Sequence, residues 1–351
     1  MNRLKRIILI RTDSSAVIGS GHVMRCLALA QSWRDSGGDI RFLCSELPDP
    51  VRTLLHDEGI DVVDIEAVRG SREDALATRA QLEEAGAGAL VLDGYRFSRE
   101  YQTALRHGRI PMLVIDDNGQ IGEYDADLIL DQNLGADPAV YEERPAEARV
   151  LLGTEYTLLR REFRDREPAR RDVAREEYRV LVTLGGGETA GLISKVLLAL
   201  DSIETERIDA VVVAGGTGEF FEAVSRTAGR LRVAIDVQHH VRNMSLVMAE
   251  ADIAISGGGS TCWELAFMGV PGVTIIRAEN QRLIAERLHD AGILECLGPE
   301  VEIRQEDITT AVGALLSSPE RRAEMSLKGH ALVDGQGAMR VTEQLRGIVE
   351  S

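Results

Sequence analysis

Short apolar runs alternate with longer segments of helical periodicity along the first half of the chain. The apolar runs predict buried strands at residues 7–10, 40–44, 62–65, 90–93, 112–116 and 127–130. The segments between them predict helices over residues 21–36, 51–59 and 72–85. Strands that alternate with helices are typical of βαβ units, so we expect a mostly parallel sheet.

The same pattern restarts after a charged stretch near the middle of the chain. Residues 160–177 mix Arg, Asp and Glu densely, which is typical of a solvated helix end and a linker. Beyond this stretch we predict strands at 179–184, 210–214, 253–256 and 273–276, and helices over 192–200, 262–268 and 280–291. The pattern indicates two Rossmann-like, doubly wound α/β domains with an interdomain cleft: residues 1–165, a linker at 166–177, and residues 178–351.

The composition is that of a globular protein with an acidic surface. Of the 351 residues, 44% are hydrophobic and 28% are charged, which is enough apolar material for two cores. The net charge of -17 disfavours sequence-blind binding to nucleic acid or to an anionic membrane. An acidic chain can still bind an anionic small molecule where backbone N–H groups and a few cations converge.

Cysteine usage and hydropathy indicate a cytoplasmic protein. None of the 4 cysteines forms a C-x-x-C pair, so we expect reduced, buried thiols. The apolar run behind the basic N-terminus is shorter than the roughly 7–15 residues of a secretory signal core. No stretch approaches the roughly 18 apolar residues of a membrane span. We therefore expect no membrane span, and the sequence implies no obligatory protein partner.

The first glycine loop, Gly19-Ser20-Gly21, leads from the first predicted strand into the first predicted helix. It begins like a dinucleotide-binding fingerprint, but Met24 stands where the third glycine is required. The segment before it is also too long and too polar for the usual tight turn. We therefore disfavour a nicotinamide and expect no cofactor.

His22 follows this loop at the predicted helix start. Glycines allow a ligand to approach the backbone closely, and a helix N-terminus favours a neutral imidazole that can take a proton from water. In this interpretation Asp13 orients the ring, and Gly19, Gly21 and Arg25 belong to the substrate site. The alternative is a histidine that only hydrogen-bonds the neighbouring loop, and the spacing leaves both open.

Two further glycine runs, 185–187 and 257–259, follow predicted strands. The second continues through Ser260-Thr261 into a predicted helix, a pattern suited to cradling a phosphate with backbone N–H groups and hydroxyls. The lysine of a Walker A loop is absent, which argues against ATP hydrolysis. Thr261-x-x-Glu264 also fits a helix capping box, so Glu264 has two open roles: capping the helix or accepting hydrogen bonds from a ribose diol.

Acidic residues follow two strands of the first half. Asp93-Gly94-Tyr95 and Asp116-Asp117 both begin where a predicted strand ends, so their carboxylates point toward the predicted cleft. Paired acids can bind a divalent metal or a sugar hydroxyl. Because Asp is common in turns that follow strands, we favour a turn role for the 116–117 pair.

Taken together, the motifs resemble those of a known family. They are Arg11-x-Asp13-x-Ser15-x-x-Ile18-Gly19-x-Gly21-His22-x-x-Arg25-Cys26-Leu27, Asp93-Gly94-Tyr95, Leu152-Gly153-x-x-Tyr156, Ser256-Gly257-Gly258-Gly259-Ser260-Thr261-x-x-Glu264, Glu279-Asn280-Gln281 and Asp334-Gly335-x-Gly337-Ala338-x-Arg340. This set is similar to the UDP-2,4-diacetamido-2,4,6-trideoxy-β-L-altropyranose hydrolases of pseudaminic acid biosynthesis, and the similarity covers nearly the whole chain.

The resemblance implies a GT-B-like fold, similar to the N-acetylglucosaminyltransferase of peptidoglycan synthesis. The second domain would hold UDP, and the first would hold the sugar and the chemistry, without a metal. His22 would activate a water that displaces UDP from the anomeric carbon with inversion. The further contacts implied are Tyr95 to the sugar, Glu264 to the ribose, Gly258, Gly259, Ser260 and Thr261 to the diphosphate with Gly186 nearby, Asn280 and Gln281 to the β-phosphate or sugar, and the backbone around Val241 to Met244 to the uracil.

Two other functions remain compatible with the pattern. A GT-B glycosyltransferase would use the same UDP site but move the sugar to a polysaccharide or lipid-linked acceptor instead of water. A nucleotide-sugar sensor would keep the glycine loops but would have no use for His22 as a base.

Overall fold

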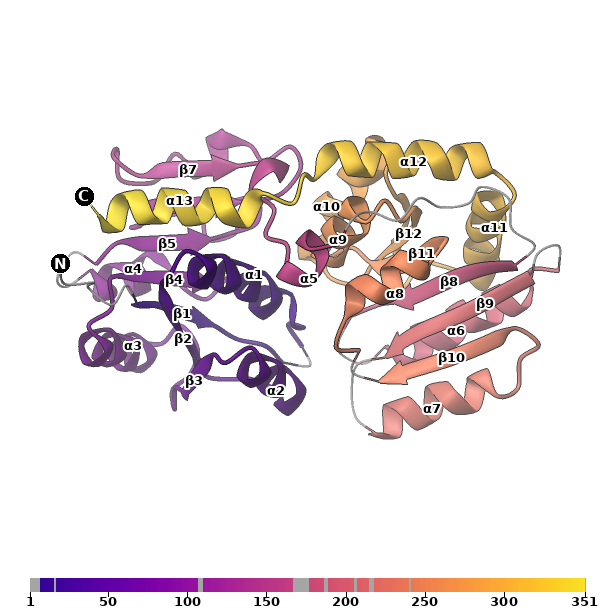
Figure 1. Cartoon of the computed structure of the whole chain (residues 1–351), viewed down its shortest axis with the longest axis horizontal. Coiled ribbons are helices and arrows are strands. Elements are labelled where there is room, and N and C mark those ends of the chain that lie inside the picture. Colours follow the sequence, from indigo (N-terminus) through magenta and orange to yellow (C-terminus); the bar gives the residue numbers. More distant parts are fainter. Residues whose placement is uncertain are drawn as a thin grey trace. The chain divides into compact units, whose positions relative to one another are not determined.

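The computed structural model of the chain describes residues 7–15, 17–106, 110–166, 177–185, 189–204, 207–214, 218–239 and 241–350. The chain forms two compact α/β units, each built on one parallel sheet (Figure 1). The first unit comprises residues 1–15, 20–161 and 335–351, and the second comprises residues 16–19 and 162–334.

The first unit has a seven-stranded parallel sheet with the order β3-β2-β1-β4-β5-β6-β7. Its strands are β1 (Ile7–Thr12), β2 (Asp39–Cys44), β3 (Asp61–Asp64), β4 (Ala89–Asp93), β5 (Met112–Ile115), β6 (Leu128–Asp131) and β7 (Arg149–Leu152). The first six confirm the predicted strands, and β7 was not predicted. The order reverses between β1 and β4, and ligands of such sheets bind outside the carboxyl ends of the strands at that reversal.

Helices cover both faces of this sheet and close two apolar cores. They are α1 (Gly21–Asp35), α2 (Asp49–Asp57), α3 (Arg72–Ala85), α4 (Arg99–Leu105) and α13 (Gly337–Val349), with short 3-10 turns at Pro138–Tyr141 and Thr154–Tyr156. The core on one face contains residues of α1, α2 and α13, and the core on the other contains residues of α3 and α4. Alternate residues of the same strands point into the two cores, so both faces of the sheet are buried, as expected of a parallel sheet.

The last helix corrects the predicted domain boundaries, because α13 belongs to the first unit and not to a second domain running to residue 351. Its Val341 and Leu345 are fully buried in the core beside α1. Its Thr342 hydroxyl lies 2.9 Å from that of Ser32. At the helix start, a Cβ on Gly337 would lie 2.3 Å from a backbone oxygen, so only glycine permits this approach. The predicted linker falls largely on residues 167–176, outside the described residues.

The second unit has a six-stranded parallel sheet with the order β10-β9-β8-β11-β12-β13. Its strands are β8 (Glu177–Thr183), β9 (Arg207–Ala214), β10 (Ala234–His239), β11 (Ile253–Gly257), β12 (Gly272–Ile276) and β13 (Glu295–Pro299). The order reverses between β8 and β11, and these two strands lead into the glycine runs at 185–187 and 257–259. Both runs therefore start at the edge of the sheet where a ligand is expected.

The helices of the second unit again lie on both faces of the sheet. They are α6 (Ala190–Asp201), α7 (Gly218–Ala228), α8 (Met244–Glu250), α9 (Thr261–Phe267), α10 (Glu279–Asp290), α11 (Gln305–Leu316) and α12 (Pro319–Leu332); α5 (Arg161–Arg164) stands at the boundary of the two units. One core joins α6 and α11 to the sheet, and another joins α8 and α9 to it. The prediction of two doubly wound α/β domains is confirmed.

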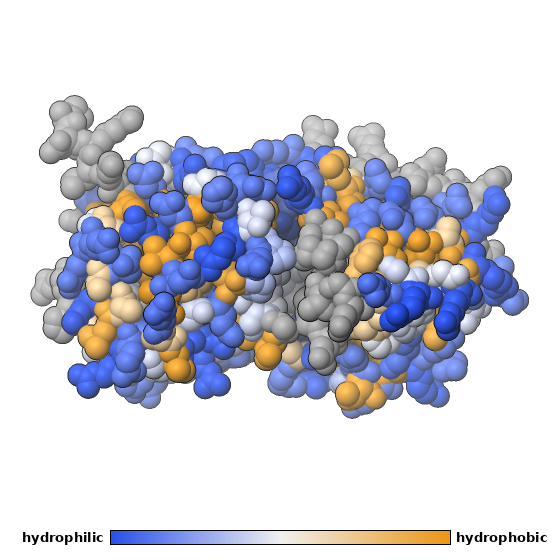
Figure 2. Space-filling model, turned by 90° about the horizontal axis from the view of Figure 1, so that it is seen from below, coloured by the Kyte–Doolittle hydropathy of each residue, from blue (hydrophilic) through white to orange (hydrophobic). Residues whose placement is uncertain are grey.

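The surface and the cysteines agree with the composition. On the face drawn in Figure 2, polar residues cover most of the surface and apolar residues gather in small groups, as is usual for a globular protein. The four cysteines are free thiols; three are buried and Cys296 is half-buried. Within the described residues, no helix is both long enough and apolar enough to cross a membrane.

Candidate active site

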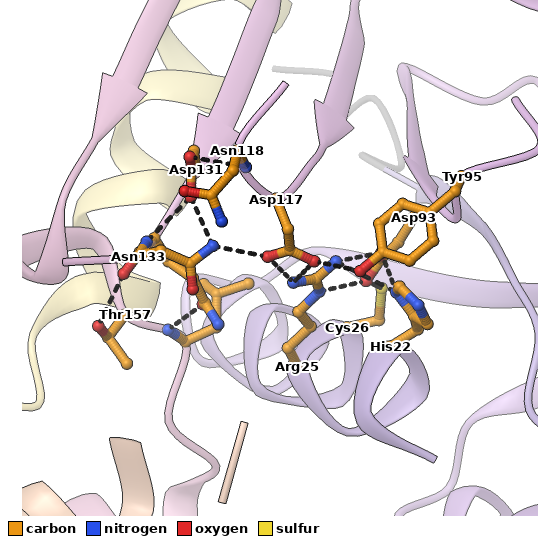
Figure 3. A network of polar contacts seen from close by, with 12 residues as sticks. His22, Arg25, Cys26, Asp93, Tyr95, Asp117, Asn118, Asp131, Asn133 and Thr157 are labelled. Atoms are coloured by element: carbon orange, nitrogen blue, oxygen red, sulfur yellow. Dashed lines mark hydrogen bonds and ion pairs between the residues drawn. The ribbon is translucent and has the colours of Figure 1, made fainter. Parts of the chain in front are cut away.

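Polar side chains of the first unit converge where its sheet order reverses (Figure 3). His22 is the second residue of α1, which follows β1, and Asp93 is the last residue of β4. Asp117 and Asn133 follow the ends of β5 and β6. Because parallel strands end at the same edge, residues more than 100 positions apart in the sequence meet in one hydrogen-bonded network.

His22 and Asp93 form a hydrogen-bonded pair at the centre of this network. The His22 Nδ1 lies 2.6 Å from Asp93 Oδ1, and Asp93 is fully buried. An ionised carboxylate only accepts hydrogen bonds, so a neutral ring must donate from Nδ1 and carry its lone pair on Nε2. This is the geometry of a general base that is oriented by a carboxylate.

Arg25 keeps this carboxylate ionised. Its Nε and Nη2 each donate to one oxygen of Asp93 at 2.7 Å, and its Nη1 donates to both oxygens of Asp117 at 2.8 and 3.0 Å. Although burial opposes ionisation, the guanidinium and the His22 ring hold the pKa of Asp93 well below its usual range. Arg25 was predicted to belong to the substrate site; in the structure all three of its nitrogens contact carboxylates of the protein.

Asp117 is the second anchor of the network. It accepts a hydrogen bond from the Tyr95 hydroxyl at 2.7 Å and another from the Asn133 amide at 2.8 Å, in addition to the Arg25 contacts. Burial opposes ionisation here too, but Arg25 lowers the pKa of Asp117. The Tyr95 ring meets the His22 ring edge-on with the centroids 5.0 Å apart. Tyr95, predicted to touch the sugar, therefore stands beside the candidate base.

Asp13 does not orient the His22 ring, which corrects the prediction. Its Oδ1 accepts hydrogen bonds from the backbone N–H groups of Ser45 at 2.6 Å and Glu46 at 3.0 Å, and its Oδ2 accepts one from Arg11 at 2.8 Å. Asp13 thus ties the end of β1 to the segment after β2. Acids follow both strands that flank the reversal of the sheet, and the sequence alone does not tell which of them faces the ring.

The neighbouring acid Asp116 has a separate environment. It accepts hydrogen bonds from the Tyr124 hydroxyl and from the Ile121 N–H, within the turn after β5. Burial raises the pKa of Asp116 to about 6, and the charge of Asp117 adds to this rise. The predicted turn role holds for Asp116 and misses the role of Asp117. Among the described residues, no three His, Cys, Asp or Glu side chains converge as a metal site.

The loop after β11 in the second unit is closely packed by α10. The N–H of Gly258 donates to the Ile275 carbonyl and to the Gln281 side-chain oxygen, both at 3.2 Å. A Cβ on Gly258 would lie 3.1 Å from the Gln281 Cβ, so a larger residue here would push α10 away from the loop. The structure thus brings Gln281 to the predicted phosphate loop. It also shows that the Gly258 N–H is already bonded within the protein.

The structure bears on the capping role left open for Glu264. The helix α9 begins at Thr261, so the N-cap residue is Ser260 and not Thr261, and the Ser260 side chain makes no capping hydrogen bond. Glu264 lies half-buried on the first turn, and its ribose contact remains a prediction. Asn280 lies on the first turn of α10, next to Gln281.

Of the remaining predicted site residues, the structure describes all but one. Met244 is the first residue of α8 and packs in a core of the second unit with Phe163. Gly19 adopts a left-handed conformation with φ of 72°, and Gly21 is the first residue of α1. Gly186 lies outside the described residues.

Arg277 is a candidate that the sequence reasoning missed. It directly follows β12, and its Nη1 donates to the Leu184 carbonyl, after β8, at 2.6 Å. Its side chain also passes 3.8 Å from where a Cβ on Gly257 would stand. The guanidinium is therefore placed beside the starts of both glycine runs. The available signal was an arginine immediately after a predicted buried strand.

Comparison with known protein families finds a match for the second half of the chain. Residues 179–338 match the glycosyltransferase family 28 C-terminal domain. This span contains the loop after β11, together with Arg277 and Gln281. The first unit's His22 network lies outside it.

Two relatives extend the similarity beyond that domain. The spore coat polysaccharide biosynthesis protein SpsG of Bacillus subtilis is 29% identical over 210 residues, which are 58% of this chain and 59% of SpsG. The UDP-2,4-diacetamido-2,4,6-trideoxy-beta-L-altropyranose hydrolase of Campylobacter jejuni is 23% identical over 81% of this chain and 97% of its own length. The chain thus spans little more than half of SpsG but nearly all of the hydrolase.

The solved structure of MurG from Acinetobacter baumannii shares the fold. It superposes with a TM-score of 0.70 at 18% identity, over 97% of this chain and 99% of MurG. Together with the two parallel sheets, this likeness confirms the expected GT-B-like, two-domain α/β fold.

Proposed function

We propose that this protein is a nucleotide-sugar hydrolase that cleaves a UDP-activated 2,4-diacetamido-2,4,6-trideoxy sugar into UDP and free sugar. The observation that carries the proposal is the His22–Asp93 pair at the sheet reversal, which directs the lone pair of a neutral imidazole to Nε2. The similarity to the Campylobacter jejuni hydrolase along nearly its entire length supports the choice of substrate.

The proposed reaction is a single displacement. A water oxygen forms a bond to the anomeric carbon while the bond from that carbon to the β-phosphate oxygen breaks, and the electron pair leaves with UDP. His22 takes the water proton on Nε2, and Asp93 stabilises the resulting imidazolium. Because UDP is a good leaving group, one base suffices where common glycosidases need two carboxylates, and the anomeric configuration inverts.

The nucleotide end of the substrate is assigned to the second unit. Backbone N–H groups from Gly259 to Thr261 would hold the diphosphate, and Glu264 would accept hydrogen bonds from the ribose. Arg277 would supply positive charge near the glycine runs. The match of residues 179–338 to a glycosyltransferase C-terminal domain supports this division of labour. No step of the proposal passes through a metal ion.

A second candidate is a glycosyltransferase with the same nucleotide site. The family 28 domain match and the similarity to a polysaccharide biosynthesis protein favour it. In this case His22 would deprotonate an acceptor hydroxyl of a polysaccharide or lipid-linked sugar instead of water. The chemistry of the base is the same, and only the nucleophile differs.

Phosphorus and proton NMR with the UDP-sugar in EDTA, without an acceptor, tests the proposal. Appearance of UDP together with the inverted free sugar supports the hydrolase. Tight binding without turnover rejects it, and turnover that starts only when an acceptor is added supports the transferase. The His22→Gln variant should lose turnover yet retain its affinity for UDP; unchanged turnover in this variant would reject His22 as the base.

A further inference from the structure

A cavity of about 450 Å³ lies at the edge of the first unit's sheet where the strands begin. Its walls come from the starts of β1, β2 and β3, the last turns of α1 and α3, and the loop after α2. The His22 network lies at the opposite edge, where the strands end. At roughly 3.3 Å per residue, the length of β1 separates the two edges by about 16 Å, so the cavity is a separate site.

Arg41, in the middle of β2, is the unusual residue in this cavity. Strand β2 lies between β3 and β1, and both faces of the sheet carry apolar cores. Ile40 and Phe42 are buried in one core, and Leu43 is buried in the other. Positions in such an interior strand are normally apolar. Arg41 interrupts this pattern on the face that Leu43 shares, and its side chain lines the cavity.

The Arg41 guanidinium has no acceptor in the described part of the protein. Its Nε is buried without a hydrogen-bond partner, and among the described residues Arg41 forms no other side-chain hydrogen bond and no ion pair. Arg11 and Arg25 in the same unit differ, because every nitrogen of their guanidinium groups reaches a carboxylate. Of the Arg41 nitrogens only Nε is buried, so the two terminal nitrogens are available to a ligand in the cavity.

Three carboxylates stand around this guanidinium. Asp39 opens β2, Asp61 opens β3, and Glu84 lies in the last turn of α3. Asp61 is the residue directly opposite Arg41 on the neighbouring strand. Even so, neither Asp61 nor Asp39 forms a side-chain hydrogen bond or an ion pair with any described residue. The cavity therefore presents uncompensated charges of both signs.

The balance of these charges selects the class of ligand. Arg34, in the last turn of α1, adds a second guanidinium, which donates to the Glu58 carbonyl. The lining still carries one more carboxylate than guanidinium groups, and the C-terminal ends of α1 and α3 add partial negative charge. A phosphate or a simple anion is repelled by the carboxylates, and a simple cation is repelled by Arg41. A ligand with one group of each sign satisfies both.

We propose that this cavity binds a small zwitterion, a molecule with one carboxylate and one ammonium group, such as a free amino acid. The carboxylate accepts hydrogen bonds from the terminal nitrogens of Arg41, and the ammonium group meets Asp39 and Asp61. The cavity volume falls within the range of roughly 300–1,000 Å³ that is usual for small-molecule sites. The proposal goes beyond the proposed reaction and does not depend on it, because no lining residue belongs to the His22 network.

Titrations followed by backbone amide NMR test the proposal on the full-length protein without UDP-sugar. The zwitterionic probes are L-alanine and γ-aminobutyrate, which hold their two charges at different separations. Butyrate, n-butylamine and inorganic phosphate are the controls with charge of one sign. At about 10 mM probe, a Kd of about 1 mM gives about 90% occupancy. We expect a zwitterion to shift the amide signals of Gly59 and Ala85 in the cavity and to leave that of Tyr95 unchanged, and the controls to bind at least about tenfold more weakly.

Two matched variants assign the binding to the cavity. Arg41→Met should abolish the shifts caused by the zwitterion. Arg52→Met should preserve them, because Arg52 lies outside the cavity on α2 and pairs with Asp64. If Arg41→Met does not fold, Asp61→Asn at an exposed position decides, and it should weaken binding of the zwitterion about tenfold.

Three results would overturn the proposal. No shift with either zwitterion at about 10 mM means that only water meets Arg41. Equal binding of butyrate or inorganic phosphate means a plain anion site, which rejects the zwitterion. Binding that persists in Arg41→Met, or in Asp61→Asn where Arg41→Met does not fold, lies elsewhere on the protein. UDP-sugar cleavage, measured on the same preparation, tests the proposed function separately, so either proposal can fail while the other stands.

Discussion

Replacing Asp93 by Asn tests the central geometry most directly. The substitution keeps the shape of the side chain but removes the charge that His22 and Arg25 share, and the contacts of Asp93 with these two residues are 2.6–2.7 Å long. An Asn amide can donate to Nδ1 as well as accept from it. The ring can then adopt the tautomer with its proton on Nε2, which cannot serve as a base.

The expected loss of kcat is large, because the substitution permits the wrong tautomer of His22 and also removes the charge that stabilises its imidazolium. Removing the equivalent charge in a serine protease triad lowers kcat by about 10⁴-fold, which corresponds to about 5 kcal/mol in the activation free energy. We expect a decrease of about 10³- to 10⁴-fold in kcat for UDP-sugar cleavage. UDP affinity should stay within about threefold, because the nucleotide is assigned to the second unit.

The assay is release of UDP under saturating substrate, with UDP affinity measured by calorimetry on the same preparation. Thermal unfolding must accompany it, because breaking a buried ion pair on one side costs about 3–5 kcal/mol and Arg25 keeps Asp117 as its remaining carboxylate partner among the described residues. A folded Asp93→Asn variant with kcat within tenfold of the wild type would refute the oriented-base interpretation. Asp13→Asn serves as the comparison, and it should lower kcat far less.

Three further predictions concern stability and the nucleotide loop. The pKa of Asp116 is about 6 in the folded protein and 3.8 ordinarily, so the free energy of unfolding should fall by about 3 kcal/mol in total as pH rises between these values. In denaturant titrations from pH 4 to 7, the Asp116→Asn variant should not show this fall in stability. Leu345→Ala should cost about 2–5 kcal/mol and speed amide exchange in the first unit's sheet, whereas Met339→Ala on the exposed side of the same helix should cost under about 0.5 kcal/mol. Gly258→Ala should weaken UDP binding about tenfold in calorimetry by displacing the start of α10, with Gly191→Ala, where a Cβ meets nothing within 4 Å, as the neutral control.

The predictable part of this fold comes from its buried parallel strands. The apolar runs near residues 7–10 and 90–93 have no polar alternation, and they emerge as the central strands β1 and β4. Because strands alternate with helices, the sheet is parallel, and its topology alone predicts that ligands bind at the edge where the strands end. This is why the pattern could put His22 and Asp93 after strands at that edge without knowledge of the contacts, whereas Gln281 was assigned only by the family resemblance.

What could not be predicted is which of several equivalent side chains makes a given contact. Asp13 and Asp93 both follow strands at the reversal, and only the register and the path of the loop decide that Asp93 meets His22. Asp116 and Asp117 are adjacent but point to opposite sides of the turn. Periodicity specifies that a helix such as α13 has an apolar face, but it does not specify which sheet that face covers.

The position of α13 has a consequence for how the protein is made. Residues 20–161 leave the ribosome early, but the helix that completes their core is translated only after all of residues 162–334. The second unit can fold as soon as it has been synthesised, whereas the first unit must wait for α13 to cover its exposed apolar surface. A late translational pause or a premature stop would therefore damage the unit encoded first and spare the one encoded last.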